Sequence, residues 1–489
     1  MEHFLTITLA LLPLLGGVVL AAVRPKRAET SRILMLGVLI AEALLSVPFL
    51  MTQGTPVTLL SLTPALSLSL RADTVGKLFA ALAVFGFLLA GIFATRYLAF
   101  SGKENSFYAF LLLSQGALLG MDLAANPLTM LLFFVSASLL SVPLVRFEGT
   151  PEANHAAKEY LLHSVLGALL ALGGILVISG FCREPGFTEG GSLDSAAAAG
   201  HETALQIAVF LGVIGFCAKA GMYPQHSWLP TAHPVAPGPA SAVLSGVLAK
   251  AGVLAPLRLI YFTVGADFLR GTWVQYVLLA LAVITVFMGS MMAYQEPLLK
   301  RRLAYSSVSQ ISYILCGVFL LTPQGLLGGL LHTLFHAAIK LCLFLTVGSF
   351  MMVGKAHRVE ELRGVGRQMP LTLGAFTLAA LALIGIPPAS GFVSKWYLAL
   401  GALDSGLPVF SWLVPVTLLL SALLTAGYLL PITIDGFFSP REEAPAQPAG
   451  EGGAKLLVPI LIAAALTLLL GVFSGPLVRL FTEATASLF

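Results

Sequence analysis

Six side chains that can take up and release protons lie inside long apolar stretches of this sequence, where a charge is costly. They are Lys219, Lys250, Lys340, Lys395, His332 and His336. A lysine at the centre of a bilayer costs about 2.5–3.5 kcal/mol on insertion scales. A single lysine could reach an interface or meet a buried carboxylate. Because the same stretches hold almost no carboxylates, we interpret the four lysines as a functional set.

Such side chains could move protons. An apolar setting disfavours the ammonium form of a lysine, so a buried lysine can lose a proton to a neighbouring water and regain one. His332, His336 and Lys340 follow one another at intervals of four residues, so they share one side of a helix over about 12 Å of rise. A lone buried histidine more often makes a contact between helices. A row of this kind predicts a proton relay through side chains and water.

The composition places these residues in a membrane protein. The chain has 489 residues, of which 57% are hydrophobic and 10% charged, and its mean hydropathy is +0.93. Soluble proteins carry about 25% charged residues. Apolar runs of about 20 residues predict an all-α polytopic fold with fourteen spans. The spans lie near 4–23, 32–51, 76–98, 106–124, 127–146, 160–181, 204–235, 240–263, 271–293, 305–321, 326–353, 370–402, 408–431 and 455–475.

The connections between these spans are short and polar. The longest polar inserts, 182–203 and 432–454, are predicted to be surface loops. Lys and Arg concentrate in the odd-numbered connections, which places those on the cytoplasmic side and both termini outside. The net charge is only +4, and the sequence has no basic cluster interleaved with aromatic residues. We therefore expect no nucleic-acid partner. The four cysteines stand singly, which predicts neither a metal site nor a disulfide framework.

Two of the spans are interrupted beside a lysine. The seventh contains "CAKAGMYP", with Lys219 before the break, and the twelfth contains "GIPPASGFVSK", with Lys395 after it. Broken apolar segments five spans apart are typical of an internally repeated transporter, and an odd number of spans makes the two copies inverted. Backbone groups freed by a break must line a cavity or meet protein. The alternative is a proline kink needed only for packing.

Four stretches in this order resemble a known family. They are "CAKAGMYPQHSWLPTAHPVAPGPASAVLSGVLAKAG", "RRLAYSSVSQISYILCGV", "HTLFHAAIKLCLFLTVGS" and "GIPPASGFVSKWYL". They are similar to the antiporter-like membrane subunits of respiratory complex I, of Mrp-type cation/proton antiporters and of membrane-bound energy-converting hydrogenases. The resemblance implies helices 1–3 over 1–104, two inverted five-helix repeats over 105–263 and 264–431, broken helices 7 and 12, and a loop with helix 14 over 432–489.

The resemblance also assigns residues. The family's lysine on broken helix 7 matches Lys219, its helix 8 lysine matches Lys250, its helix 11 pair matches His336 and Lys340, and its terminal helix 12 residue matches Lys395. The implied function is proton translocation by one subunit of a multisubunit energy-converting complex. Its partners would be other membrane subunits, including related antiporter-like ones. Its location would be a prokaryotic cytoplasmic membrane.

One position departs from the family pattern. The family places a glutamate on helix 5, five residues before a proline, where it pairs with the helix 7 lysine. Alignment on Pro143 puts Ser138 at that position. Three explanations are open. Lys219 could work without the carboxylate, another carboxylate such as Glu42 could substitute for it, or proton transfer through the first half of the chain could be impaired. We treat Ser138, Glu42 and His226 as candidate modulators of the relay.

The sequence leaves the wider role open. It contains no flavin, quinone, nucleotide or iron–sulfur motif, so we expect no cofactor and no redox chemistry in this chain. Whether the complex around it is an enzyme stays open. One alternative is a structural subunit that does not conduct, and another is a subunit of a Na⁺/H⁺ antiporter. Sodium needs clustered oxygen ligands, which the spans supply sparsely, so protons are favoured over Na⁺.

Overall fold

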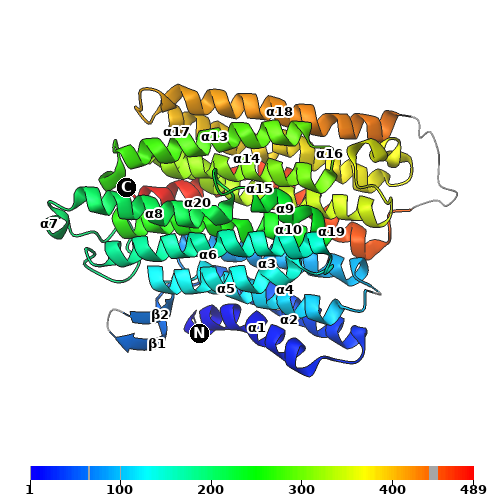
Figure 1. The fold of residues 1–489 in the computed structure, drawn as a ribbon, viewed down its shortest axis with the longest axis horizontal. Coiled ribbons are helices and arrows are strands. Elements are labelled where there is room, and N and C mark those ends of the chain that lie inside the picture. The colour runs from blue at the N-terminus through cyan, green and yellow to red at the C-terminus, as the bar shows by residue number, and fades with distance from the viewer. Residues whose placement is uncertain (1, 64–65, 100, 440–449) are drawn as a thin grey trace.

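The computed structural model describes residues 2–63, 66–99, 101–439 and 450–489. Long helices run side by side through this part of the chain (Figure 1). Eleven of the described helices are long and apolar enough to cross a membrane. The predicted all-helical membrane fold is therefore confirmed.

The first five long helices follow the predicted ranges within four residues, whereas the sixth begins nine residues before the predicted start at 160. The six helices are α1 Glu2–Val23, α2 Ala28–Leu50, α3 Thr74–Tyr97, α4 Glu104–Asp122, α5 Pro127–Val145 and α6 Pro151–Ser179. Their starts are encoded locally. Asn126 and Thr150 accept hydrogen bonds from backbone N–H groups of the first turns of α5 and α6, and a proline opens each helix.

The predicted break in the seventh span is confirmed. Helix α8 (Glu202–Ala220) ends at Gly221, whose φ of 72° is the left-handed conformation that glycine adopts without strain. The chain resumes as α9 (Trp228–Val235). The eighth span is also irregular: it consists of α10 (Gly238–Gly246), η1 (Leu248–Lys250), α11 (Ala251–Leu259) and the π-helical η2 (Ile260–Val264).

The second half of the chain repeats the pattern of long helices and one break. It contains α13 Trp273–Gln295, α14 Leu299–Phe319, α15 Pro323–Met352, α16 Pro370–Ile384, α17 Ser390–Leu403, α18 Phe410–Phe438, α19 Ala454–Val472 and α20 Ser474–Ala486. Gly385, at φ 96°, separates α16 from α17, as predicted for the twelfth span. A Cβ at Gly391 would lie 1.9 Å from the backbone oxygen of Ala382, so α16 and α17 approach each other this closely only because residue 391 is glycine.

Helices cover all fourteen predicted ranges, but three of these elements fall outside the eleven apolar spans. Helices α4 and α14 and the α16–α17 pair differ from the others in polarity or in length. The number fourteen, the two inverted repeats and the boundaries at 104, 263 and 431 therefore stay predictions.

Several connections hold structure that the sequence did not reveal. A hairpin of β1 (Val57–Thr63) and β2 (Leu66–Leu70) joins α2 to α3, and short helices α7 (Ser195–Ala198) and α12 (Ala266–Leu269) lie in two other connections. The predicted loop at 432–454 is wrong at its start, because α18 continues to Phe438. Phe437 packs against Gly366 there, which supports the extra turn. Residues 440–449 of that loop lie outside the described residues.

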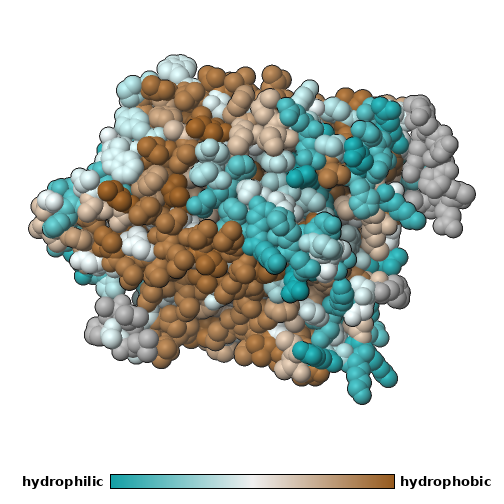
Figure 2. Space-filling model, in the orientation of Figure 1, coloured by the Kyte–Doolittle hydropathy of each residue, from teal (hydrophilic) through white to brown (hydrophobic). Residues whose placement is uncertain are grey.

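The surface and the ends of the helices fit a membrane setting. Figure 2 shows a hydrophobic band across the helices and a hydrophilic end to its right. Large apolar side chains such as Leu419 and Leu423, each 71% exposed, lie on the outside of the bundle. Both termini, the hairpin and α7 lie toward the opposite end (Figure 1). The most enclosed of the apolar spans are Gly238–Val264 and α15, which carry Lys250 and Lys340.

Candidate functional site

Lys219 lies in the last turn of α8 and is surrounded by hydroxyl groups. Its side chain is buried, and Nζ donates to Ser138 Oγ at 3.0 Å and to the Tyr160 hydroxyl. The Tyr160 hydroxyl in turn lies 2.7 Å from Ser141 Oγ. The aromatic rings of Tyr160 and Trp228 also face the ammonium, with centroids 4.4 and 5.9 Å from Nζ. The partners described for Lys219 are thus neutral side chains of α5, α6 and α9.

Ser138 therefore faces the lysine that the family pairs with a glutamate. Glu42 has a different neighbour. Its Oε2 accepts a hydrogen bond from Gln115 on α4, and its Oε1 has no partner among the described residues. Glu42 connects α2 to α4, while Lys219 bonds to α5 and α6.

Lys250 lies where the eighth span loses its α-helical pattern. The helix is interrupted at Val247, and Lys250 Nζ donates to the backbone oxygen of Ser245 at 2.5 Å. Ser245 Oγ lies 2.7 Å from Ser307 Oγ, which links this span to α14. Irregular backbone inside a membrane protein needs such partners, and here the lysine supplies one.

His332, His336 and Lys340 form a continuous buried series on α15, which we call the α15 row. All three are 0% exposed, and the two imidazole centroids are 5.8 Å apart. His332 Nδ1 lies 2.9 Å from Ser394 Oγ, and its Nε2 lies 3.1 Å from Gln310 Oε1. Lys340 donates to the backbone oxygen of Leu303 at 3.0 Å and to the Ser306 hydroxyl.

His336 is the member of this row without a hydrogen-bond partner. Neither of its ring nitrogens is bonded within the part of the chain that the structure describes. It lies within electrostatic range of Lys250, Lys340 and Lys395, as well as of His332. The charges of lysines from three separate spans thus act on this imidazole.

Lys395 ends the series on α17. Its Nζ donates to the backbone oxygens of Leu383 at 2.6 Å and Ile384 at 2.8 Å, at the end of α16. A helix C-terminus carries partial negative charge, which favours a cation there. Nζ also lies 5.2 Å from the centroid of Tyr313, whose ring is stacked on His332. The twelfth-span lysine is therefore connected to the α15 row through one aromatic ring.

His226 lies in the break between α8 and α9 and is half-buried. Its ring is stacked on Tyr223, with centroids 5.9 Å apart. The adjacent Ser227 donates to Glu159 Oε1 at 2.6 Å and lies 3.3 Å from His163 Nε2. The group on α6 is thus contacted by Ser227, whereas the ring contact of His226 itself is with Tyr223.

The sequence analysis missed a buried ion pair. Arg258 on α11 makes two hydrogen bonds to the carboxylate of Asp73, at 2.6 and 2.7 Å, and both side chains are buried. Burial would raise the pKa of Asp73, but the charge and hydrogen bonds of Arg258 outweigh it and hold this pKa below its usual value. The sequence did offer a signal for this pair, because Arg258 is a charged residue inside the predicted span 240–263.

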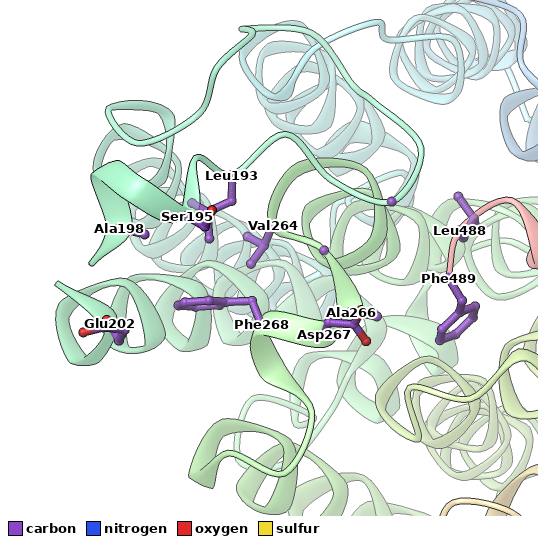
Figure 3. Close-up of a pocket in the computed structure, with 12 residues that line it drawn as sticks. Leu193, Ser195, Ala198, Glu202, Val264, Ala266, Asp267, Phe268, Leu488 and Phe489 are labelled. Carbon is purple, nitrogen blue, oxygen red and sulfur yellow. The ribbon is translucent and has the colours of Figure 1, made fainter. Parts of the chain in front are cut away.

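A surface cavity lies at the end that holds the termini. It has a volume of about 390 Å³ and opens between the 182–203 insert, α12 and the C-terminus (Figure 3). Glu202, Asp267 and Phe489 are among the residues that line it. Within the described ranges, no group of three or more His, Cys, Asp or Glu side chains is placed to hold a metal ion.

Comparisons with known proteins agree with this architecture. Residues 124–431 match the family model described as "NADH:quinone oxidoreductase/Mrp antiporter, TM". NADH-quinone oxidoreductase subunit N of Desulforudis audaxviator (strain MP104C) is 33% identical over 422 residues, which are 82% of this chain and 81% of that protein. Hydrogenase-4 component B of Escherichia coli (strain K12) is 33% identical over 68% of this chain and 50% of its own.

A solved structure shows the same fold. A chain of the Mrp complex from Dietzia sp. DQ12-45-1b superposes with a TM-score of 0.87 at 24% identity, covering 100% of this chain and 97% of that one. The family match spans more than half of the sequence and includes all four lysines. The chain therefore belongs to the family of antiporter-like membrane subunits found in NADH:quinone oxidoreductases and Mrp antiporters.

Proposed function

We propose that this chain translocates protons through its buried lysines and histidines, as one subunit of a larger membrane complex. The observation that carries the proposal is the position of His336. It is fully buried, its two ring nitrogens have no partner among the described residues, and it interacts electrostatically with lysines from three spans. Buried polar atoms are normally satisfied, so an unbonded imidazole here favours water or a transferred proton as its partner.

The groups around the α15 row are suited to passing a proton on. His332 is held by Ser394 and Gln310, one at each ring nitrogen. An imidazole can accept a proton at one nitrogen and release one from the other, to water or to the next group. Lys250, Lys340 and Lys395 each donate to a backbone oxygen, which stabilises the ammonium form after it accepts a proton. Each lysine then returns to the neutral form by releasing the proton to water or to the next group.

In the first half of the chain, Lys219 can carry protons in the same way, but its hydrogen-bond acceptors are side-chain hydroxyl groups. Ser138 and Tyr160 accept hydrogen bonds from Lys219 without bringing a negative charge. Hydroxyl groups stabilise an ammonium less than a carboxylate does, which favours release of the proton. We propose that Lys219 conducts without the family's glutamate, and that Glu42 does not replace it, because Glu42 bonds to Gln115.

The two halves are proposed to be the inverted repeats at 105–263 and 264–431, with Lys219 and Lys395 beside equivalent breaks. Partner subunits complete the complex, since the related proteins are named as subunits of such complexes. The carried ion is the proton rather than Na⁺, because the spans offer few oxygen anions. A non-conducting structural subunit is the second candidate, and the serine at position 138 is the observation that favours it.

Alanine substitutions of two lysines test the proposal. We expect Lys250→Ala and Lys395→Ala each to lower proton pumping by the reconstituted complex at least tenfold, since each removes a carrier. Assembly should stay intact by native gel. Lys455→Ala, which removes an exposed lysine at the start of α19, is the matched control and should pump normally. Full pumping by the double variant Lys250→Ala/Lys395→Ala would leave only the structural role.

A further inference from the structure

We propose that a cavity between α1, α4 and α5 binds the phosphate group of an anionic phospholipid. The cavity has a volume of about 570 Å³ and lies where α1 and α5 end and α4 begins. Because α1 starts at the N-terminus, its last turn lies at the opposite end of the bundle (Figure 1). None of the six buried lysines and histidines of the proposed relay lines this cavity. The inference therefore goes beyond proton transport and does not depend on it.

Three cationic side chains from separate segments line this one cavity. Arg24 follows α1, Lys103 precedes α4 and Arg146 follows α5. Among the described residues of the lining there is no carboxylate, and the other polar side chains are those of Asn105 and Ser106. Cations that share a site repel one another. An anion in the cavity would remove this repulsion and add an attraction to each of the three.

The hydrogen bonds described for the three cations leave donors that suit a phosphate. Arg24 donates from Nε to the backbone oxygen of Ala21 at 3.2 Å, and Arg146 donates from Nε to Asn154 Oδ1 at 2.6 Å. Lys103 Nζ donates to two backbone oxygens that follow α5, each at the long distance of 3.3 Å. The paired terminal nitrogens of a guanidinium are the donors that meet phosphate oxygens in a bidentate arrangement. Both arginines can therefore bind a phosphate without losing the bonds that hold them.

The backbone of Arg24 is strained. Its φ of 45° lies in the left-handed region, which costs a residue with a Cβ free energy. Glycine would adopt this conformation without strain and would end α1 equally well. The presence of an arginine at such a position favours a role for its side chain, and that side chain lines the cavity.

The rest of the lining favours a lipid over a soluble anion. Ala21, Phe110 and Pro143 supply apolar surface inside the cavity. Val18 and Leu139, one helical turn before Ala21 and Pro143, are 55% and 47% exposed. Apolar side chains therefore continue from the cavity along α1 and α5, toward the middle of the membrane. A headgroup beside the cations would place its acyl chains along this surface, as in basic pockets between membrane-spanning helices that bind anionic lipids.

The charge rule for membrane proteins does not explain this arrangement by itself. Basic residues are expected at the predicted cytoplasmic end, which accounts for their number. It does not account for three of them on one cavity. Lys26 and Arg27 lie in the same connection as Arg24, are exposed and do not line the cavity. They serve as controls that change the net charge of this end without changing the site.

The first test measures lipid binding by the purified full-length chain with native mass spectrometry. The probes are dioleoylphosphatidylglycerol, which is anionic, and dioleoylphosphatidylcholine, which has no net charge. Each basic residue near an anionic lipid strengthens binding about fivefold, so Arg24→Gln/Lys103→Gln/Arg146→Gln should weaken binding of phosphatidylglycerol by at least about tenfold. Binding of phosphatidylcholine should stay at the wild-type value. The three positions are exposed, so the substitutions leave the core of the bundle unchanged.

The matched control is Lys26→Gln/Arg27→Gln/Arg363→Gln, which removes three exposed cations outside the cavity. We expect it to bind both lipids as the wild type does. Equal losses in the two triple variants, or a loss in neither, would overturn the site. Displacement of phosphatidylglycerol by millimolar inorganic phosphate would assign the cavity to a soluble anion and overturn the lipid.

The second test identifies what occupies the cavity in the assembled complex. Phe110→p-benzoylphenylalanine places a photoreactive ring on the cavity lining, and Leu419→p-benzoylphenylalanine places one on the exposed apolar surface of α18. The complex is irradiated in vesicles of phosphatidylcholine with a minor share of phosphatidylglycerol. We expect phosphatidylglycerol to dominate the adducts at position 110, and the adducts at position 419 to follow the vesicle composition. Adducts at position 110 that follow the composition, or that join another subunit, would overturn the proposal.

Discussion

Restoring a carboxylate beside Lys219 tests how this subunit works without one. Ser138 Oγ lies 3.0 Å from Lys219 Nζ, so Ser138→Glu brings a negative charge against the ammonium. At a separation of about 4 Å and an effective dielectric constant of about 20, the attraction is worth about 4 kcal/mol. That would displace the protonation equilibrium by up to about 3 pH units. Crowding by the longer side chain costs about 1–3 kcal/mol of stability, whether or not it is charged.

The assay is proton pumping against pH by the reconstituted complex. A lysine held in its charged form releases its proton only at higher pH, so we expect the profile of Ser138→Glu to move upward by about one to three units. Ser138→Gln has nearly the same shape without the charge and should keep the wild-type profile. Tyr160 and Trp228, which also face Lys219, are unchanged in both variants. Identical profiles for the two variants would refute a proton-carrying role of Lys219.

Two further predictions concern stability and topology. Arg258→Leu leaves the carboxylate of Asp73 buried without its partner and should cost about 3–5 kcal/mol, measured as a lower unfolding temperature in detergent; a wild-type midpoint would contradict this. Because the pKa of Asp73 is held low, its ionised carboxylate adds to the free energy of unfolding. This contribution is complete above the ordinary carboxyl pKa of about 3.9 and is lost as the pH falls below it. The Asp73→Asn variant should not show that loss. Cysteines at Glu360 and Glu189, both exposed, should be labelled from the cytoplasmic and the outer side respectively, and labelling of both from one side would refute the topology.

Local signals explain why the breaks and the α15 row could be predicted. Gly221 and Gly385 end their helices in left-handed conformations, a preference that belongs to the residue type itself. His332, His336 and Lys340 share a face because of helical spacing alone. Ser138 was placed opposite Lys219 by alignment on one proline, and the structure places the two side chains in contact.

Contacts between distant segments could not be predicted in the same way. Tyr160 meets Lys219 across 59 positions, and Arg258 meets Asp73 across 185. No periodicity connects such pairs, because only the packing of the folded helices brings them together. The β1–β2 hairpin was missed for another reason: its alternating Leu and Ser residues lie in a connection between two dominant apolar spans.

The acceptors of the four lysines differ in how they can evolve. The partners described for Lys219 are side chains, whereas Lys250, Lys340 and Lys395 all bond to main-chain oxygens, and Lys340 bonds to the Ser306 hydroxyl as well. A main-chain oxygen persists when the residue that carries it is replaced. We therefore expect substitutions among related chains to covary between positions 138, 160 and 219. At the other three lysines we expect no covariation with the residues whose main-chain oxygens they contact. Methods that infer contacts from correlated substitutions would detect the first half of the relay more readily than the second.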